Sequence, residues 1–260
     1  MANVTKKDDR ATVDSDTKIS ASVDANEVAF FARISAEWWN PDGPFRPLHE
    51  LNPCRINYIR NILTRHYAPD NAKTKVLEGL RILDIGCGGG LICEPLTRLG
   101  ATMIGVDATQ KNIHVASLHA EEMGLKIDYR HTTAEDLAKT GEQFDAIINM
   151  EVVEHVADLG VYLGSCRQLL KSDGIMLVST LNRTVKSLLL AKIGAEYILR
   201  WLPIGAHDWN KFLKPKELKA ALEGAGFAMN DLEGMVYNPL TRRWKLDAND
   251  TAINYAVSAV

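Results

Sequence analysis

The sequence predicts an α/β protein built on a mostly parallel sheet with an antiparallel edge. Between residues 81 and 180, short β-rich runs alternate with helical ones. This alternation is typical of right-handed βαβ crossovers and of a sheet covered by helices on both faces. Near the C-terminus two further β-rich runs follow each other with no helix between them, and such runs can pair antiparallel at a sheet edge. A chain of 260 residues suits one large domain with appendages or two small domains.

The chain begins with a tail and a helical segment. Residues 1–23 are polar and aperiodic, so we expect a disordered tail. From Asp24 onward apolar residues recur at helical spacing, which predicts a first helix with Asp24 as its N-cap. A second helix is expected over "LHELNPCRINYIRNILTRH", with Pro53 in its first turn, where proline is tolerated. Residues 24–79 are therefore predicted to form an N-terminal helical extension of a domain at 80–260.

Seven runs predict the strands of the sheet. In chain order they are "RILDIG", "TMIGVD", "IDYRHT", "FDAIINM", "GIMLVST", "FAMNDLEGMVYN" and "INYAVSAV". Helices between the first five strands are expected to begin near Ile92, Thr109, Glu135 and Val152. A last helix, "KPKELKAALEGAG", should stop at Gly224 and lead into the two antiparallel strands.

Composition excludes some classes of function and location. The formal charge is −3 and the pI is about 6.2, so the chain lacks the basic surface that nucleic-acid binding needs. The four cysteines form no CxxC pair and no zinc spacing, which is typical of thiols in a reducing compartment. The N-terminus has no apolar signal core, and no run is long and apolar enough to span a membrane. We therefore expect a cytoplasmic protein without nucleic-acid partners.

The loop "GCGGG" after the first strand is the strongest sign of a ligand site. Parallel sheets bind ligands at the carboxyl ends of their strands. A dinucleotide fingerprint counted from Gly86 would need a third glycine where Leu91 stands, which disfavours a nicotinamide dehydrogenase. Asp107 ends the second strand, and its carboxylate can accept hydrogen bonds from both hydroxyls of a ribose. The site therefore suits an adenosine-containing ligand that needs no diphosphate, such as S-adenosylmethionine.

Four segments in order, "LDIGCGGG", "GVDAT", "FDAIINMEVVEHV" and "GIMLVSTLNR", resemble class I S-adenosylmethionine-dependent methyltransferases, which have a Rossmann-like fold. Outside this core, "EWWNPDGPFRPLHELNPCRINYI", "GAEYILRWLPIGAHDWNKFLKP" and "YNPLTRRWKL" resemble the ubiquinone biosynthesis O-methyltransferases. The resemblance implies O-methylation of polyprenylated catechol and demethylubiquinol intermediates. It also implies a polyprenylated phenol as substrate and other ubiquinone-biosynthesis proteins as partners. The alternatives are an O-methyltransferase of another small phenol and a non-catalytic nucleoside-binding module.

By the same resemblance, Arg55, Gly86, Asp107 and Met150 match the positions that bind the methyl donor. The Arg55 guanidinium suits the carboxylate of the methionine moiety, because it forms charge-assisted hydrogen bonds in a fixed fork. Met150 ends the fourth strand, where its side chain or backbone can form a wall for the adenosine. The alternatives are a surface arginine and a methionine of the core.

A cluster of ionisable residues follows the fourth strand. In "MEVVEHV", Glu151, Glu154 and His155 would share one face of a helix that begins at the ligand edge. Such a set can hold a divalent cation such as magnesium, or His155 can act as a general base toward a phenol, whose pKa is about 10. The alternative is a helix start without a catalytic role. His207 is a second candidate base.

The segment at about residues 185–210 predicts an amphipathic insert. Lys186, Lys192, Glu196 and Arg200 gather on about a third of the helical wheel, while apolar residues and Trp201 lie mostly elsewhere. Because a polyprenylated substrate resides in a bilayer, this insert is expected to touch the membrane surface transiently. The protein would then be peripheral on the inner face of the membrane. The alternative is an ordinary helix packed on the core.

Overall fold

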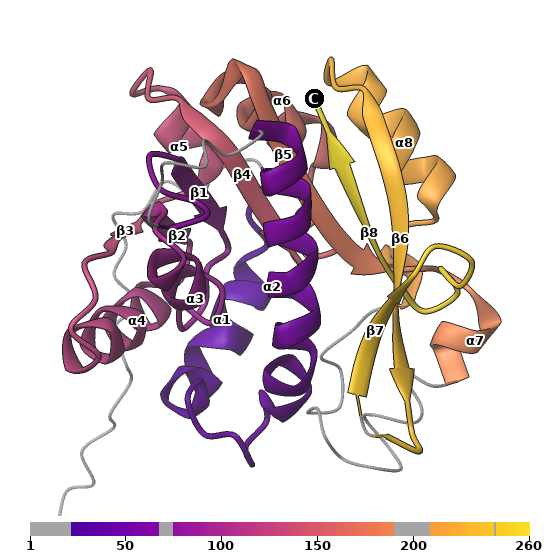
Figure 1. The fold of residues 1–260 in the computed structure, drawn as a ribbon, viewed down its shortest axis with the longest axis horizontal. Helices are drawn as coiled ribbons and strands as arrows, with labels where there is room; N and C mark the ends of the chain where they lie inside the picture. The colour runs from indigo at the N-terminus through magenta and orange to yellow at the C-terminus, as the bar shows by residue number, and fades with distance from the viewer. Residues whose placement is uncertain (1–21, 68–74, 190–208, 242) are drawn as a thin grey trace, which may run out of the picture.

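The structure, a computed structural model, describes residues 22–67, 75–189, 209–241 and 243–260 (Figure 1). Its sheet has eight strands in the order β3-β2-β1-β4-β5-β8-β6-β7. The strands are β1 (Arg81–Ile85), β2 (Thr102–Asp107), β3 (Asp128–His131), β4 (Phe144–Met150), β5 (Leu170–Leu181), β6 (Met229–Asn238), β7 (Arg243–Asp247) and β8 (Asn254–Ala259). The strands β1 to β5 run parallel, whereas β8, β6 and β7 continue the sheet antiparallel. The predicted fold class is confirmed.

The sheet has one strand more than the seven that the sequence predicts. The extra strand, β7, pairs with β6 as a hairpin at the edge of the sheet, from Gly234 opposite Asp247 to Asn238 opposite Arg243. No residue of β7 is fully buried. An edge strand commonly carries charged side chains that oppose further strand pairing. The Arg243–Asp247 run therefore lacks the strong apolar pattern that identifies a central strand.

The helices cover both faces of the sheet. They are α1 (Ala25–Ile34), α2 (Arg46–Tyr67), α3 (Cys93–Arg98), α4 (Gln110–Glu122), α5 (Ala134–Ala138), α6 (Leu159–Leu169), α7 (Val185–Ser187) and α8 (Pro215–Gly224), with short 3₁₀ turns η1 (Ser35–Glu37) and η3 (Trp209–Lys211). The Asp24 carboxylate accepts a hydrogen bond from the Asn26 amide at 2.9 Å, which confirms the predicted N-cap. The predicted stop at Gly224 is also confirmed.

Two predicted helix starts are wrong. The helix α2 begins at Arg46, so Pro47 lies in its first turn and Pro53 lies inside the helix. With two prolines six residues apart, the sequence does not distinguish which one marks the start. The helix predicted from Val152 begins only at Leu159, because the chain first makes a turn that contains Glu151 with φ of 58°. This second correction changes the geometry of the candidate site.

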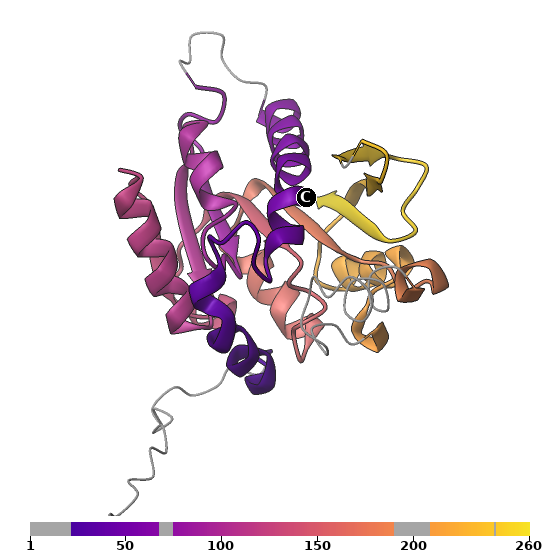
Figure 2. The same cartoon turned by 90° about the horizontal axis from the view of Figure 1, so that it is seen from below.

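Alternate residues of the central strands pack into two apolar clusters, one on each face. Ile82 of β1 faces the cluster that includes α2 and α3, whereas its neighbour Leu83 faces the cluster that includes α5, α6 and α8. The helix α2 crosses in front of the sheet in Figure 1, and α2 and α8 lie on opposite sides of it in Figure 2. The core is therefore a three-layer sandwich, and the carboxyl ends of β1, β2 and β4 are free to form a site.

Most of the predicted tail and most of the predicted insert lie outside the described residues. Residues 1–21 of the predicted tail and residues 190–208 of the predicted insert, which include Trp201 and His207, lie outside them. Ser22 is buried: its hydroxyl donates to the Glu135 carboxylate and its carbonyl accepts from the Ala157 amide. Within the described ranges, no helix has the length and apolarity that crossing a bilayer requires.

The packing of α2 on the sheet gives a first prediction. Ile59 on its inner face is fully buried, so Ile59→Ala should lower the free energy of unfolding by about 2–5 kcal/mol through lost burial and a residual cavity. Arg60→Ala, at the exposed neighbouring position, is the control and should change it by no more than about 0.5 kcal/mol. Urea unfolding measures both. Equal effects of the two substitutions would contradict the assignment of the inner face.

Candidate functional site

The glycine loop between β1 and α3 is shaped by the N-terminal extension. Gly88 has φ of 54°, and a Cβ at this position would lie 2.4 Å from the Trp38 ring. A Cβ at Gly89 would lie 2.5 Å from Trp38 as well. The Trp38 indole N–H donates to the Asn112 side chain at 2.9 Å, and the Trp39 indole N–H donates to the Gly89 carbonyl at 2.9 Å. Two of the loop glycines are therefore required by tryptophan packing, which the sequence interpretation missed.

Asp107, at the end of β2, fixes the same loop through hydrogen bonds to its backbone. Its carboxylate accepts hydrogen bonds from the Gly88 amide at 3.0 Å and the Thr109 amide at 2.7 Å. The side chain is almost completely buried, and this burial raises its pKa even though the two amides favour the charged form. Asp107 thus fixes the loop geometry in addition to lining the cavity above it.

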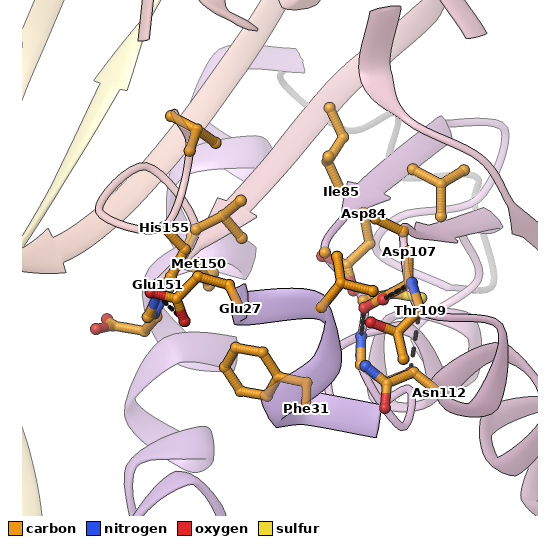
Figure 3. Close-up of a pocket in the computed structure, with 18 of the residues that line it drawn as sticks. Glu27, Phe31, Asp84, Ile85, Asp107, Thr109, Asn112, Met150, Glu151 and His155 are labelled. Carbon is orange, nitrogen blue, oxygen red and sulfur yellow. Dashed lines mark hydrogen bonds and ion pairs between the residues drawn. The ribbon is translucent and has the colours of Figure 1, made fainter. Parts of the chain in front are cut away.

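A cavity of about 260 Å³ opens above the carboxyl ends of the strands (Figure 3). Its floor includes Gly86, Asp107 and Met150, and Arg55 and the turn after β4 close one side. The helix α1 covers the cavity as a roof: Figure 3 shows Glu27 and Phe31 of α1 facing the ends of the strands, below Asp84 and Asp107 in this view. The cavity thus brings together residues from α1, α2 and three strands.

Arg55 of α2 is buried beside this cavity with part of its hydrogen-bonding capacity unused. Only 4% of the residue is exposed, and its Nη2 lies 3.4 Å from Glu151 Oε1. Among the described residues, neither Nε nor Nη2 has a hydrogen-bond partner. Glu151 supplies one anion beside the guanidinium, but leaving Nε and Nη2 without hydrogen bonds in a buried position is costly, so Arg55 keeps donors for a further acceptor. Arg55 therefore fits a ligand that carries a carboxylate.

The turn after β4 places its three ionisable residues differently from the predicted helix. Glu151 has φ of 58°, a conformation that costs energy in a residue with a side chain and often marks a functional site. Its carboxylate accepts a hydrogen bond from the Ser179 hydroxyl at 2.8 Å. Glu154 accepts one from Thr180 at 2.8 Å, and burial, together with Glu151, raises its pKa. The expectation that Glu151, Glu154 and His155 share one helix face is wrong.

His155 turns toward the roof of the cavity. Its Nδ1 lies 3.2 Å from the Glu27 carboxylate of α1. Burial favours the neutral imidazole, but the carboxylates of Glu27, Glu154 and Glu151 outweigh it and raise the pKa of His155. The three predicted metal ligands thus engage different partners, and the part of the chain that the structure describes contains no group of three or more His, Cys, Asp or Glu residues able to hold a metal ion. The divalent cation stays a prediction.

Asp84 is a further buried acid at the site that the sequence interpretation did not single out. It lies at the base of the glycine loop, only 2% exposed, and accepts a hydrogen bond from the Cys93 thiol at 3.2 Å. Burial raises its pKa to about 7. The signal was present in "LDIG", where an acid interrupts an otherwise apolar central strand.

Of the predicted site residues, Arg55, Gly86, Asp107, Met150, Glu151 and His155 all line the one cavity. Glu154 lies behind them, against Thr180 of β5. The sequence interpretation missed Glu27, Phe31 and Trp38, which reach the cavity from the N-terminal extension. Their contacts join residues more than seventy positions apart, so no local pattern could reveal them.

Comparisons with known proteins show the family of the chain. A family model described as "Methyltransferase domain" matches residues 55–232. The chain is 54% identical over 244 residues to the ubiquinone biosynthesis O-methyltransferase of Dinoroseobacter shibae, covering 94% of this chain and 98% of the relative. It is 55% identical over 238 residues to the protein of that name from Chelativorans sp., covering 92% and 94%.

Solved structures resemble the fold at lower sequence identity. A methyltransferase from Thermotoga maritima, described as a possible histamine N-methyltransferase, matches with a TM-score of 0.64 at 17% identity and covers 90% of this chain and 99% of its own. Magnesium protoporphyrin IX methyltransferase from Synechocystis with bound S-adenosylmethionine matches with a TM-score of 0.57 at 16% identity, covering 93% and 99%. These likenesses support the α/β architecture.

The burial of Asp84 predicts a pH-dependent stability. Because the pKa of Asp84 is higher in the folded than in the unfolded chain, its ionisation opposes folding, and stability falls as pH rises from about 4 to about 7. Asp84→Asn cannot ionise, so its free energy of unfolding, measured by urea denaturation, should drop less than that of the wild type between pH 5 and pH 8. We expect the two proteins to differ in this drop by on the order of 2 kcal/mol. Identical pH dependence would show that Asp84 titrates normally.

Proposed function

Because the chain belongs to the ubiquinone biosynthesis O-methyltransferases, we propose that it transfers the methyl group of S-adenosylmethionine to a phenolic oxygen of polyprenylated ubiquinone precursors. The acceptors are the early polyprenyl catechol and the late demethylubiquinol. The observation that carries the proposal is the cavity, in which buried Asp107 lies at the glycine loop while buried Arg55 and His155 lie at the turn after β4.

The donor is bound by residues of the strand ends and of α2. Arg55 is assigned to its carboxylate, since the free N–H groups of the guanidinium can complete charge-assisted hydrogen bonds there. Asp107 is assigned to the ribose hydroxyls, and Gly86 lets the ligand approach the backbone closely. Met150 forms an apolar wall. When bound, S-adenosylmethionine supplies a methyl group activated by its positively charged sulfur.

His155 is assigned as the base that receives the phenolic proton. A free phenol has a pKa of about 10, so proton removal in the site increases the nucleophilicity of the oxygen. In the reaction an O–CH₃ bond forms and the C–S bond of the donor breaks, while the proton passes to His155. Glu27, 3.2 Å from the other side of the ring, stabilises the imidazolium that results.

A membrane surface is the second partner in this proposal. The described start of the insert already exposes apolar area, since Val185 is 69% exposed and Leu189 53% exposed. The sequence beyond it adds Lys192, Arg200 and Trp201, residue types suited to an anionic interface. The protein would therefore visit the bilayer surface reversibly to reach its acceptor, working from the inner face of the membrane. Other proteins of ubiquinone biosynthesis stay expected partners.

A methyl-transfer assay tests the reaction. With S-adenosylmethionine, the wild-type protein should methylate a catechol that carries a short isoprenoid tail, with a lower KM than for the tail-less catechol, because the tail adds buried apolar area. Equal KM values for the two catechols would favour an O-methyltransferase of another small phenol. An absence of turnover on both would favour a nucleoside-binding module.

The same preparation tests the donor site. Arg55→Ala should weaken binding of S-adenosylhomocysteine by roughly tenfold to a hundredfold, because a hydrogen bond to a charged group contributes about 1.5–3 kcal/mol. Arg55→Lys keeps the charge but loses the fork, and we expect it to recover part of the affinity. Arg60→Ala on the exposed face of α2 is the matched control. Calorimetric titration measures each, and unchanged affinity in Arg55→Ala would remove Arg55 from the donor site.

Liposome sedimentation tests the membrane proposal. Binding should strengthen with anionic lipid and weaken with salt, because it depends partly on cationic side chains. Replacing both Leu199 and Trp201 by glutamate should abolish it, while activity on the tail-less catechol is retained. Equal loss of both activities in a folded variant would instead identify the insert as part of the active site.

A further inference from the structure

The roof helix α1 has an apolar stripe that faces the cavity. Val28, Phe31 and Ile34 recur at a spacing of three residues and all line the cavity. None of the residues of α1 is fully buried. Amphipathic helices normally bury such a stripe against the core. Here the stripe is only half covered, and the space beside it is the cavity itself.

Phe31 is the member of this stripe that reaches the candidate base. Its ring meets the His155 ring edge to face, with centroids 5.6 Å apart and planes at 88°. On its other side Phe31 packs against the cluster of Trp38, Phe45 and Leu91, which fixes its position. Figure 3 shows Phe31 between the group around His155 and the group around Asp107. Phe31 therefore stands where the two halves of the cavity meet.

The chemistry of the lining separates the two halves. Around Asp107 the cavity offers the glycine loop and polar groups, among them Thr109 and Asn112, which suit a nucleoside. Around His155 the turn contributes Val152 and Val156, which together with Phe31 make an apolar and aromatic surface beside the carboxylates of Glu27 and Glu151. The Phe31 ring lies beside His155, the candidate proton acceptor. This pair suits an aromatic substrate whose hydroxyl proton is to be removed.

Ion pairs hold α1 in the position that presents this ring. Lys211 of η3 lies 3.1 Å from the Asp24 carboxylate and 3.2 Å from the Glu27 carboxylate. Glu27 in turn faces His155. The helix is thus tied to the turn after β4 through its first turn, and Phe31 lies one turn further along the same helix. The geometry of the ring relative to His155 therefore depends on these polar contacts as well as on the packing of Phe31 against Trp38, Phe45 and Leu91.

We propose that Phe31 forms a wall of the acceptor subsite and packs against the aromatic ring of the phenolic substrate. This inference rests on the proposed function, because it names the part of the chain that selects the acceptor. Phe31 acts by contact with the ring, so its contribution is the same for acceptors with and without an isoprenoid tail. It makes no contribution to donor affinity.

Steady-state kinetics of Phe31→Ala and Phe31→Leu test the proposal. Phe31→Ala should raise the KM for the tail-less catechol and for the short-tailed catechol by the same factor, roughly tenfold, since it removes an aromatic contact together with its buried area. Phe31→Leu keeps apolar bulk and should raise both KM values by a smaller factor. The affinity for S-adenosylhomocysteine, measured by calorimetry, should stay within about twofold of the wild type in both. Arg33→Ala, on the exposed side of α1, should leave all these values unchanged.

Three results would overturn the proposal. Weakened binding of S-adenosylhomocysteine by the same factor as the KM change would place Phe31 in the donor site. A KM change confined to the tailed catechol would place it along the path of the tail, and unchanged KM values would remove it from the acceptor subsite. If the wild type methylates neither catechol, the proposed function fails. Calorimetric titration of catechol into the protein saturated with S-adenosylhomocysteine then still decides whether Phe31 contacts the ring.

Discussion

The contact between Trp38 and the glycine loop is the constraint on which the site depends. The indole lies so close to Gly88 and Gly89 that neither position can carry a side chain, and its N–H is bonded to Asn112. Through this contact the N-terminal extension sets the shape of the loop, and Asp107 sets it from the other side by accepting the Gly88 amide. The extension and the sheet therefore form one structural unit around the cavity.

This arrangement explains why the residues of the site come from two parts of the fold, the ends of the central strands and the N-terminal extension. The strand ends supply backbone and acids for a nucleoside, as parallel sheets commonly do. The extension supplies what the strand ends lack: Arg55 as a cation, Glu27 beside His155, and Phe31 as an aromatic surface. A general nucleoside-binding fold is thereby adapted to a second, aromatic ligand, because the added helices enclose the space next to the first.

The sequence was informative wherever a local pattern had a single structural cause. The alternation of strands and helices, the N-cap Asp24 and the placement of Asp107 at a strand end could all be predicted. The turn after β4 could not, because Glu151 adopts a positive φ that its residue type does not favour. The pairing of His155 with Glu27 also depends on tertiary packing, since over a hundred residues separate them.

The low burial of α1 affects how ligands enter and leave the cavity. It has ten residues, none of them fully buried, and the ion pairs of Lys211 and His155 tie down its first turn. Segments with little buried apolar area open at a small fraction of the free energy that global unfolding requires. We therefore expect α1 to open at a lower free energy than the sheet, so that ligands exchange without disturbing the hydrophobic core.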